Sequence, residues 1–253
     1  MRTGRGRGIS AGEATAPEPG RRAGPTAVAI AAMDEEAAAL SELADEALTG
    51  DGTHRQTELR FGPTEIVLLR SGIGFANATA AAAYAFHTFG SDVPIISIGT
   101  AGGLAADVNL GDVVVGDRYV NLNADATAFG YALGQVPGMP EHYDADPSLL
   151  RRIRASTHPV RLLARPIGSS EMFVTTRRAV ELRANFPEVA AVDMESAAIA
   201  QYAHVHKMSF ISVRGISDLC APDGEEFLTH RDHTASRAAA VVATLLRGIS
   251  AQS

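Results

Sequence analysis

The chain has 253 residues and a formal net charge of −7. Hydrophobic residues make up 46% and charged residues 20%, a composition that is typical of globular proteins and excludes a chain disordered throughout. Residues 1–25 hold five arginines against two glutamates, so the rest of the chain is more acidic than the total, and an acidic surface repels phosphate backbones. We therefore expect no nucleic-acid partner. Cys220 is the only cysteine, which excludes an intrachain disulfide and a cysteine-based zinc site.

The first 25 residues are rich in Gly, Pro and Arg and contain no apolar stretch of the kind found in secretory signals. We predict a disordered tail over 1–25 and a single folded domain over 26–250. No uninterrupted apolar run reaches the roughly 18 residues of a transmembrane helix. These observations predict a cytoplasmic protein with no membrane partner.

Short apolar runs alternate with helical stretches along the rest of the chain. Residues 27–32 are continuously apolar, which predicts a strand buried on both faces, and an acidic Ala/Leu-rich helix is predicted over 34–48. Residues 55–61 and 64–70 predict a hairpin. The further predicted elements are a helix over 76–89, strands over 94–98 and 113–115, a loop over 121–145, a helix over 147–156, a strand over 160–165, a helix over 176–184, a strand over 189–192, a helix over 195–206, a strand over 210–213 and a helix over 225–248. This alternation predicts one α/β domain with a central, mostly parallel mixed β-sheet flanked by α-helices.

Small or acidic residues directly follow several predicted strands, and ligands bind at the carboxyl edge of α/β sheets. Either one of the three carboxylates at 34–36 faces a cleft, since successive helical residues point in different directions, or these acids only complement the dipole of the following helix. The stretch 99–103 either lets a ligand approach the backbone, with the Thr100 hydroxyl as a hydrogen-bonding group, or is a plain turn. Asp218 closely follows an apolar strand, where a carboxylate costs free energy to desolvate unless it has a partner or a function, so it is the strongest candidate.

Two further patterns give alternatives. The stretch 71–77 looks like a dinucleotide fingerprint with Gly72 and Gly74, although Asn77 occupies the third glycine position; it indicates either a nicotinamide-dependent oxidoreductase or only a tight turn. His230 and His233 have a spacing that a metal could use, but they lack a third ligand, so we expect no metal site.

Eight stretches, spread over nearly all of residues 26–250, carry a more specific pattern. They are AAMDEEAAAL (31–40), LLRSGIGFANA (68–78), IGTAGGLA (98–105), LGDVVVGD (110–117), DATAFGYALGQVPGMP (125–140), EMFV (171–174), NFPEVAAVDMESAAIA (185–200) and VRGISDL (213–219). In this order and spacing, the chain resembles the 5′-methylthioadenosine/S-adenosylhomocysteine nucleosidases of the nucleoside phosphorylase/nucleosidase superfamily. The resemblance implies a nucleoside-phosphorylase-like fold.

The resemblance also implies hydrolysis of the N-glycosidic bond of an adenine nucleoside, through an oxocarbenium-like ribose and without a cofactor. Glu36 would activate the attacking water, Glu195 would bind the ribose hydroxyls, and Asp218 would protonate adenine N7. The other implied site residues are Met194 at the ribose, Phe173, Val174, Ser217, Ala101 and Gly102 at adenine, Thr100 and Arg214 beside the water and ribose, and Met33, Phe129, Pro137 and Phe227 around the 5′ substituent. A homodimer is implied, because Phe129 and Pro137 match residues that a partner chain lends to the 5′ pocket.

Hydrolysis and phosphorolysis are distinguished at one position. Phosphorylases of the superfamily carry an arginine where this chain has Ser97, and the Glu36 carboxylate would repel phosphate, so hydrolysis is favoured. The alternatives are a hydrolase of another 5′-modified nucleoside (futalosine-type or 5′-deoxyadenosine), a purine nucleoside phosphorylase, and a non-catalytic nucleoside-binding protein. Asp193 stands where the family usually has glutamate, and the stretch 219–226 is unlike the family, so the preferred 5′ group stays open.

Overall fold

The helices and strands lie in residues 24–50, 55–220 and 225–249, the part of the chain that the computed structural model describes; most of the tail expected over 1–25 lies outside it. In chain order they are β1 Ala27–Ala31, α1 Asp34–Ser41, β2 Glu46–Gly50, β3 Gln56–Phe61, β4 Thr64–Arg70, α2 Phe75–Phe89, β5 Ile95–Gly103, β6 Val113–Asn121, the 3-10 helix η1 Thr127–Phe129, β7 Tyr143–Asp144, α3 Pro147–Ala155, β8 Leu162–Ser169, α4 Thr176–Asn185, β9 Ala191–Asp193, α5 Ser196–His206, β10 Phe210–Asp218 and α6 Glu225–Gly248. No helix within these ranges is both long enough and apolar enough to cross a bilayer.

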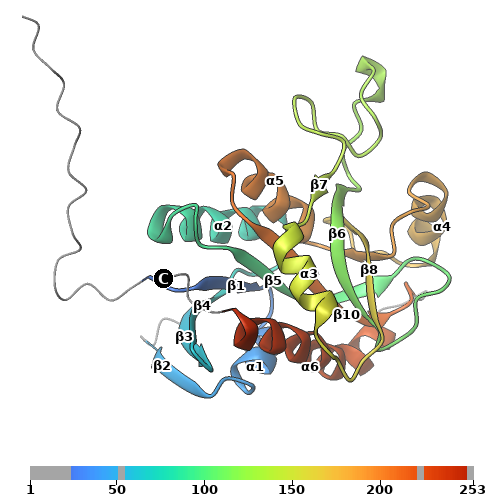
Figure 1. Ribbon diagram of the computed structural model, residues 1–253. Helices are drawn as coiled ribbons and strands as arrows, with labels where there is room; N and C mark the ends of the chain where they lie inside the picture. Colours follow the sequence, from blue (N-terminus) through green and yellow to red (C-terminus); the bar gives the residue numbers. More distant parts are fainter. Residues whose placement is uncertain (1–23, 51–54, 221–224, 250–253) are drawn as a thin grey trace, which may run out of the picture.

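The strands form one mixed sheet with the order β10-β6-β8-β9-β5-β1-β4-β3-β2. Because β5 also pairs in parallel with β10, the strands β5, β10, β6, β8 and β9 close into a circuit. From β5 the sheet continues through the parallel strands β1 and β4 to the antiparallel strands β3 and β2. Helices lie on both sides of the strands (Figure 1), which confirms the expected α/β domain.

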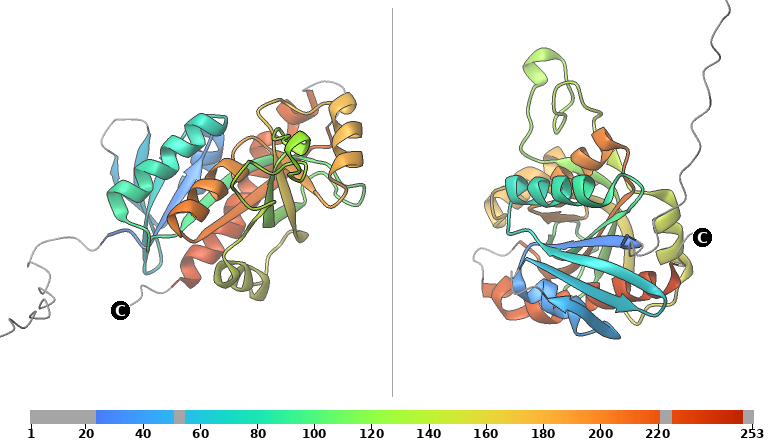
Figure 2. Two further views of the ribbon diagram at one scale, coloured as in Figure 1. Left: turned by 90° about the horizontal axis from the view of Figure 1, so that it is seen from above. Right: turned by 90° about the vertical axis from the view of Figure 1, so that its left-hand side faces the viewer.

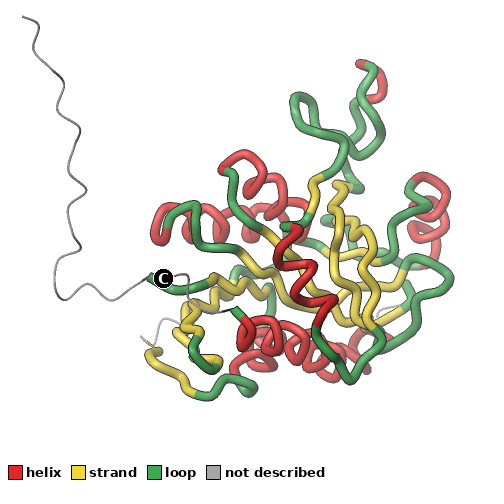
Figure 3. The backbone as a smooth tube through the Cα atoms, viewed as in Figure 1, coloured by secondary structure: helices red, strands yellow, loops and turns green. Residues whose placement is uncertain are grey.

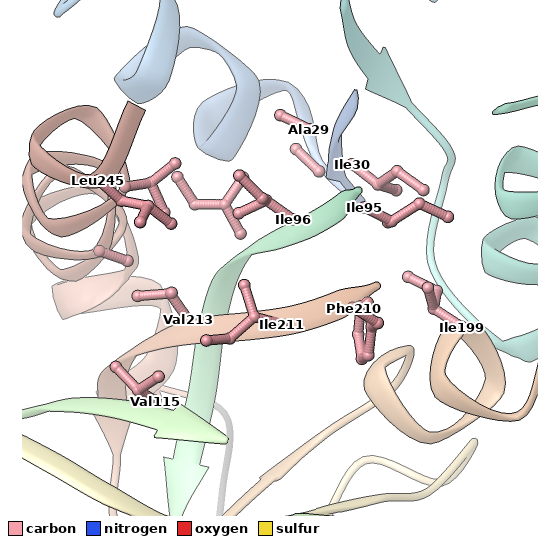
Figure 4. Packing of buried hydrophobic residues seen from close by; sticks show 14 of the residues in the cluster. Ala29, Ile30, Ile95, Ile96, Val115, Ile199, Phe210, Ile211, Val213 and Leu245 are labelled. Atoms are coloured by element: carbon pink, nitrogen blue, oxygen red, sulfur yellow. The ribbon is translucent and has the colours of Figure 1, made fainter. Parts of the chain in front are cut away.

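Apolar side chains from the predicted strands fill the space between sheet and helices. On one face, Ile96 and Val213 lie toward Leu245 of α6, and on the other, Phe210 lies toward Ile199 of α5 (Figure 4). The helices α1 and α6 share one side of the sheet, and α2 and α5 share the opposite side (Figure 2). Burying each such aliphatic side chain contributes roughly 1.5–3 kcal/mol relative to exposure, so this packing holds the strand ends in place.

The helix predicted over 34–48 is wrong in its second half. The helix α1 ends at Ser41, and Glu46–Gly50 form β2 instead. In β2, Glu46 lies opposite Arg60 of β3, and the two side chains form an ion pair at 2.5 Å. Pairing with the neighbouring strand therefore outweighs the helical propensity of this Ala/Leu-rich stretch, which is a weak determinant by itself.

Four strands, β5, β6, β8 and β10, extend at least four residues beyond their predicted ends, and β8 continues to Ser169. The strands β5, β6 and β10 continue to Gly103, Asn121 and Asp218, because the small residues in these stretches keep pairing with their neighbours. Asp218 lies opposite Gly102, after an irregularity that begins at Ile216. The candidate residues at 99–103 and 214–218 therefore lie on strands and not in the loops that follow.

Residues 121–145 run mainly as a loop, as predicted, and include only η1 and the short strand β7 beyond the end of β6. This segment stands out from the rest of the molecule in Figure 3. Phe129, at the end of η1, is 84% exposed, so the segment presents a large aromatic side chain to its surroundings.

Replacing Gly215 by alanine is expected to destabilise the fold. A Cβ atom at Gly215 would lie 2.1 Å from the backbone oxygen of Thr234, because α6 packs directly on β10. Such overpacking costs about 1–3 kcal/mol, and urea denaturation should show a lower midpoint. Gly248→Ala is the matched control, since a Cβ there meets no atom within 4 Å. Equal midpoints for the two variants would contradict this packing argument.

Candidate active site

A cavity of about 250 Å³ lies at the carboxyl ends of β1, β5, β9 and β10. Twelve of the predicted site residues line it: Met33, Glu36, Thr100, Ala101, Gly102, Phe173, Val174, Met194, Glu195, Ser217, Asp218 and Phe227. Other lining residues were not anticipated, namely Ala32, Ile73, Met172, Val192, Asp193 and Arg231. Residues far apart in the sequence thus converge on one site that contains several carboxylates.

Glu36 lies in the first turn of α1 and reaches β5. Its Oε2 accepts hydrogen bonds from the backbone N–H groups of Ala32 (3.0 Å) and Met33 (3.1 Å). Its Oε1 accepts from the backbone N–H (2.8 Å) and the hydroxyl (3.2 Å) of Thr100. A Cβ atom at Gly99 would lie 2.5 Å from this oxygen, so the glycine makes room for the carboxylate.

Burial raises the pKa of Glu36, while the nearby Arg214 charge and the backbone hydrogen bonds act against that rise. The side chain is only 4% exposed. A carboxylate with a raised pKa is a better base than an ordinary one, and the hydrogen bonds hold it in one orientation. Glu36 is therefore suited to accept a proton from a small molecule in the cavity.

Glu195 precedes α5 and points toward the start of α2. Its Oε1 accepts a hydrogen bond of 3.0 Å from the backbone N–H of Gly74, whose φ of 97° favours glycine. Burial, followed by the negative charge of Asp193, raises the pKa of Glu195 to about 8, and Arg214 acts against this rise. Glu195 is thus a buried hydrogen-bonding group in the cavity wall that holds a proton more tightly than an exposed carboxylate.

Replacing Glu195 by glutamine is expected to stabilise the fold at pH 8. Because the pKa is raised in the folded state, that state holds a proton which the unfolded chain releases between about pH 4.5 and 8, so stability falls as pH rises through this window. A neutral amide removes the loss, and its oxygen can still accept the Gly74 N–H. Denaturation at pH 8 should show a gain of about 1 kcal/mol or more, with a smaller gain at pH 5. The exposed Glu188→Gln should change neither value, and an equal gain at both pH values would contradict the argument.

Asp218 is the last residue of β10. Its Oδ2 accepts a hydrogen bond of 3.0 Å from the Ser217 hydroxyl, and its Oδ1 accepts one of 2.9 Å from the backbone N–H of Cys220. Burial raises the pKa of Asp218, and these two hydrogen bonds act against the rise. A carboxyl group in this environment is protonated at a higher pH than usual, so it is suited to donate a proton.

Arg214 is 2% exposed and does not line the cavity, although it was expected beside the water and ribose. Its Nε donates to Asp193 Oδ2 and its Nη2 donates to Ser97 Oγ, both at 2.8 Å. Asp193 also accepts hydrogen bonds from the hydroxyls of Ser169 (2.5 Å) and Ser196. Because every member has partners, this buried network can place one positive charge close to several carboxylates.

Two aromatic rings form part of the cavity wall. Phe173 and Phe227 meet edge to face, with ring centroids 5.8 Å apart. The loop that carries Phe173 is tied down by Glu171, whose Oε1 accepts a hydrogen bond of 2.9 Å from the N–H of Phe75 and whose N–H donates at 2.8 Å to Asn123 Oδ1. A flat aromatic ligand fits between such apolar walls and the carboxyl group.

The stretch around Gly72 and Gly74 does not form a dinucleotide site. In such sites the first N–H groups of the helix bind a pyrophosphate. Here the N–H groups of Gly74 and Phe75 donate to the carboxylates of Glu195 and Glu171. Two carboxyl groups already accept the hydrogen bonds of the N–H groups that would bind a pyrophosphate, which argues against the hypothesis of a nicotinamide-dependent enzyme.

Comparisons with known proteins agree with this geometry. The family described as "Phosphorylase superfamily" matches residues 26–247. A 5′-methylthioadenosine/S-adenosylhomocysteine nucleosidase from Anoxybacillus flavithermus is 36% identical over 208 residues, which cover 79% of this chain and 89% of the relative. Another from Marinomonas sp. is 33% identical over 228 residues, which cover 87% of this chain and 97% of the relative. The crystal structure of the nucleosidase from Neisseria meningitidis in complex with methylthio-immucillin-A superposes with a TM-score of 0.80 at 32% identity, covering 88% of this chain and 99% of that one. The chain therefore belongs to the 5′-methylthioadenosine/S-adenosylhomocysteine nucleosidase family of the phosphorylase superfamily.

Proposed function

We propose that this enzyme hydrolyses the N-glycosidic bond of 5′-methylthioadenosine and S-adenosylhomocysteine, releasing adenine and a 5′-modified ribose. The observation that carries the proposal is the convergence of Glu36, Glu195 and Asp218, three buried carboxyl groups with raised pKa values, on one cavity. A solved relative from Streptococcus pneumoniae, 30% identical over 87% of this chain and 97% of its own with a TM-score of 0.81, binds a transition-state inhibitor, MT-ImmA. The relatives therefore support hydrolysis as the reaction at this site.

Asp218 and Phe173 account for the recognition and departure of the base. Adenine is a poor leaving group until N7 accepts a proton, and the raised pKa of Asp218 provides a proton donor in the cavity. Ser217 keeps the Asp218 carboxyl group oriented. Phe173 stacks on the purine, and Val174, Ala101 and Gly102 complete the adenine pocket.

Glu36 and Glu195 act on the ribose side. As the glycosidic bond lengthens, positive charge develops on the ribose, and nearby carboxylates stabilise it. Glu36 removes a proton from the water that attacks the anomeric carbon, beside Thr100. Glu195 holds the ribose hydroxyls, and Met194 packs against the sugar.

Water, rather than phosphate, is the nucleophile in this proposal. The position at which phosphorylases of the superfamily carry an arginine is Ser97, whose hydroxyl accepts a hydrogen bond from the buried Arg214. The Glu36 carboxylate lines the cavity and would repel a phosphate that entered it, because like charges repel. Adenine release from methylthioadenosine in phosphate-free buffer tests the proposal; release only after phosphate addition would indicate a phosphorylase.

The proposed active form is a homodimer in which each chain completes the 5′ pocket of the other. Phe129 and Pro137 do not line the cavity of their own chain. Large exposed apolar side chains lie on α2, α5 and the segment 121–145, namely Tyr84, Val205, Phe129 and Leu133. Large apolar side chains exposed on these elements are available for contact with a second copy of the chain. Light scattering should give twice the chain mass, and Phe129→Ala should raise KM for methylthioadenosine; a monomer with unchanged KM would contradict the dimer.

A further inference from the structure

A second, more open groove of about 420 Å³ continues from the cavity. Ala32, Met33 and Ile73 line both spaces. The groove lies between the segments that follow β1 and β4, two adjacent parallel strands, and so belongs to the same carboxyl edge of the sheet. Two acidic and two basic side chains line it, Asp34, Glu35, Arg55 and Arg70, and we call this space the charged groove.

Two ion pairs lie in and beside the charged groove. Arg70 pairs with Asp34, and Glu35 pairs with Arg231 of α6 at 2.8 Å. The Asp34 side chain is 72% exposed and the other three are about one-third exposed. Ion pairs at such exposure contribute little to stability, so a ligand that brings its own charges can replace one partner at small cost.

The position of the groove relates it to one part of the proposed substrate. With adenine beside Asp218 and the ribose beside Glu195, the 5′ substituent leaves the sugar from C4′, on the opposite side of the ring oxygen from the base. Met33 and Ile73 form the cavity wall that borders the groove. A substituent longer than a methylthio group therefore passes these two apolar side chains and enters the charged groove.

We propose that the charged groove is a subsite for the zwitterionic α-amino-acid end of a 5′-thioether substituent, with Arg70 binding its carboxylate and Asp34 and Glu35 binding its ammonium group. The proposal rests on the proposed function, because it assumes the orientation of the nucleoside in the cavity. Opposite charges on neighbouring walls match a group that carries both charges, whereas a neutral methylthio group gains nothing from them. The groove residues therefore set the preference between charged and neutral 5′ substituents.

Steady-state kcat/KM values for three nucleosides test the subsite: S-adenosylhomocysteine, its decarboxylated aminopropylthio analogue, and methylthioadenosine. Arg70→Gln should lower kcat/KM for S-adenosylhomocysteine, relative to that for methylthioadenosine, about fivefold. The same variant should not lower the relative kcat/KM for the decarboxylated analogue, because only S-adenosylhomocysteine has a carboxylate. Asp34→Asn should lower both ratios, because both charged nucleosides carry an ammonium group. The double variant Asp34→Asn/Arg70→Gln removes both charges of this ion pair, so neither side chain is left as an unpaired charge. It should still lower kcat/KM for S-adenosylhomocysteine relative to that for methylthioadenosine.

Arg60→Gln is the matched control, since Arg60 forms ion pairs with Glu46 and Glu65 on the hairpin away from the groove. Ratios that stay within twofold of wild type in every groove variant, with methylthioadenosine still hydrolysed, would overturn the subsite and leave the proposed function standing. If the wild-type enzyme releases no adenine from any of the three, the proposed function is wrong. The subsite is then decided by calorimetric Kd values, in which Arg70→Gln must weaken S-adenosylhomocysteine more than methylthioadenosine.

Discussion

Replacing Glu36 by glutamine is expected to lower kcat for adenine release about a thousandfold, the effect of losing a general base. The amide cannot take a proton from water, although its oxygen can still accept the N–H of Thr100. The N–H groups of Ala32 and Met33 lose their shared acceptor, Oε2, because the amide nitrogen that replaces it cannot accept them. Single-turnover measurements of adenine release with excess enzyme would isolate the chemical step from product release.

The control for this variant must separate lost chemistry from lost structure. Glu188→Gln makes the same change at an exposed position and should keep the wild-type kcat. Calorimetric titration of Glu36→Gln with adenine should give a Kd within about threefold of wild type, because the base is bound by other residues. A kcat within tenfold of wild type would rule out Glu36 as the base. If Glu36→Gln loses adenine binding as well, Thr100→Val is titrated in the same way, because it removes one hydrogen bond of Glu36 and keeps the carboxylate. Loss of adenine binding in this second variant too would show that the substitutions damage this wall of the cavity.

The sequence predicts much of the cavity because its residues follow a physical rule. Apolar strands that lead into small or acidic residues mark the carboxyl edge of the sheet, and this rule alone brings Glu36, Gly102 and Asp218 to one edge. The glycine at position 99 also belongs to this edge, where a Cβ atom would collide with the Glu36 carboxylate. The roles of the residues, by contrast, depend on the resemblance to a family.

Other features arise from contacts between distant parts of the chain, which no local pattern encodes. The closed circuit depends on β5 pairing with both β9 and β10. Arg214 was expected at the cavity, yet it lies in a buried network because Ser97 of β5 and Asp193 of β9 supply its hydrogen-bond partners. One signal could have indicated this network: serines within otherwise apolar strands, such as Ser97 and Ser212, need buried polar partners.

Position 193 illustrates how a departure from the family pattern can be accommodated. The aspartate carboxylate bonds Arg214 and accepts hydroxyl hydrogen bonds from Ser169 and Ser196. The same carboxylate is one of the charges that raise the pKa of Glu195. Its negative charge therefore acts on Glu195, the proposed ribose-binding residue, at the same time as it neutralises the buried Arg214 guanidinium.

Replacing Asp218 by asparagine is expected to lower kcat by a factor between about a hundred and ten thousand, the range for a lost general acid. The proposed mechanism needs the protonated form of Asp218, so wild-type activity should fall as the pH rises through its raised pKa. The asparagine variant has no proton to lose in this range, and its small remaining activity should not fall at alkaline pH. The profile of kcat against pH, measured from pH 5 to 10 for both proteins, checks both the size of the loss in kcat and the missing fall at alkaline pH.

The shape of that profile distinguishes a proton donor from a residue that only binds the base. If Asp218 merely accepts hydrogen bonds from adenine, the variant would raise KM and keep the alkaline fall of the wild type. Asp92→Asn, at an exposed position after α2, controls for the loss of one negative charge and should reproduce the wild-type curve. Because Ser217 and the Cys220 N–H direct both oxygens of the carboxyl group, the side chain is held in place before the nucleoside binds. The effect of the substitution should therefore fall on the chemical step, which requires a proton at N7 and not only contact with it.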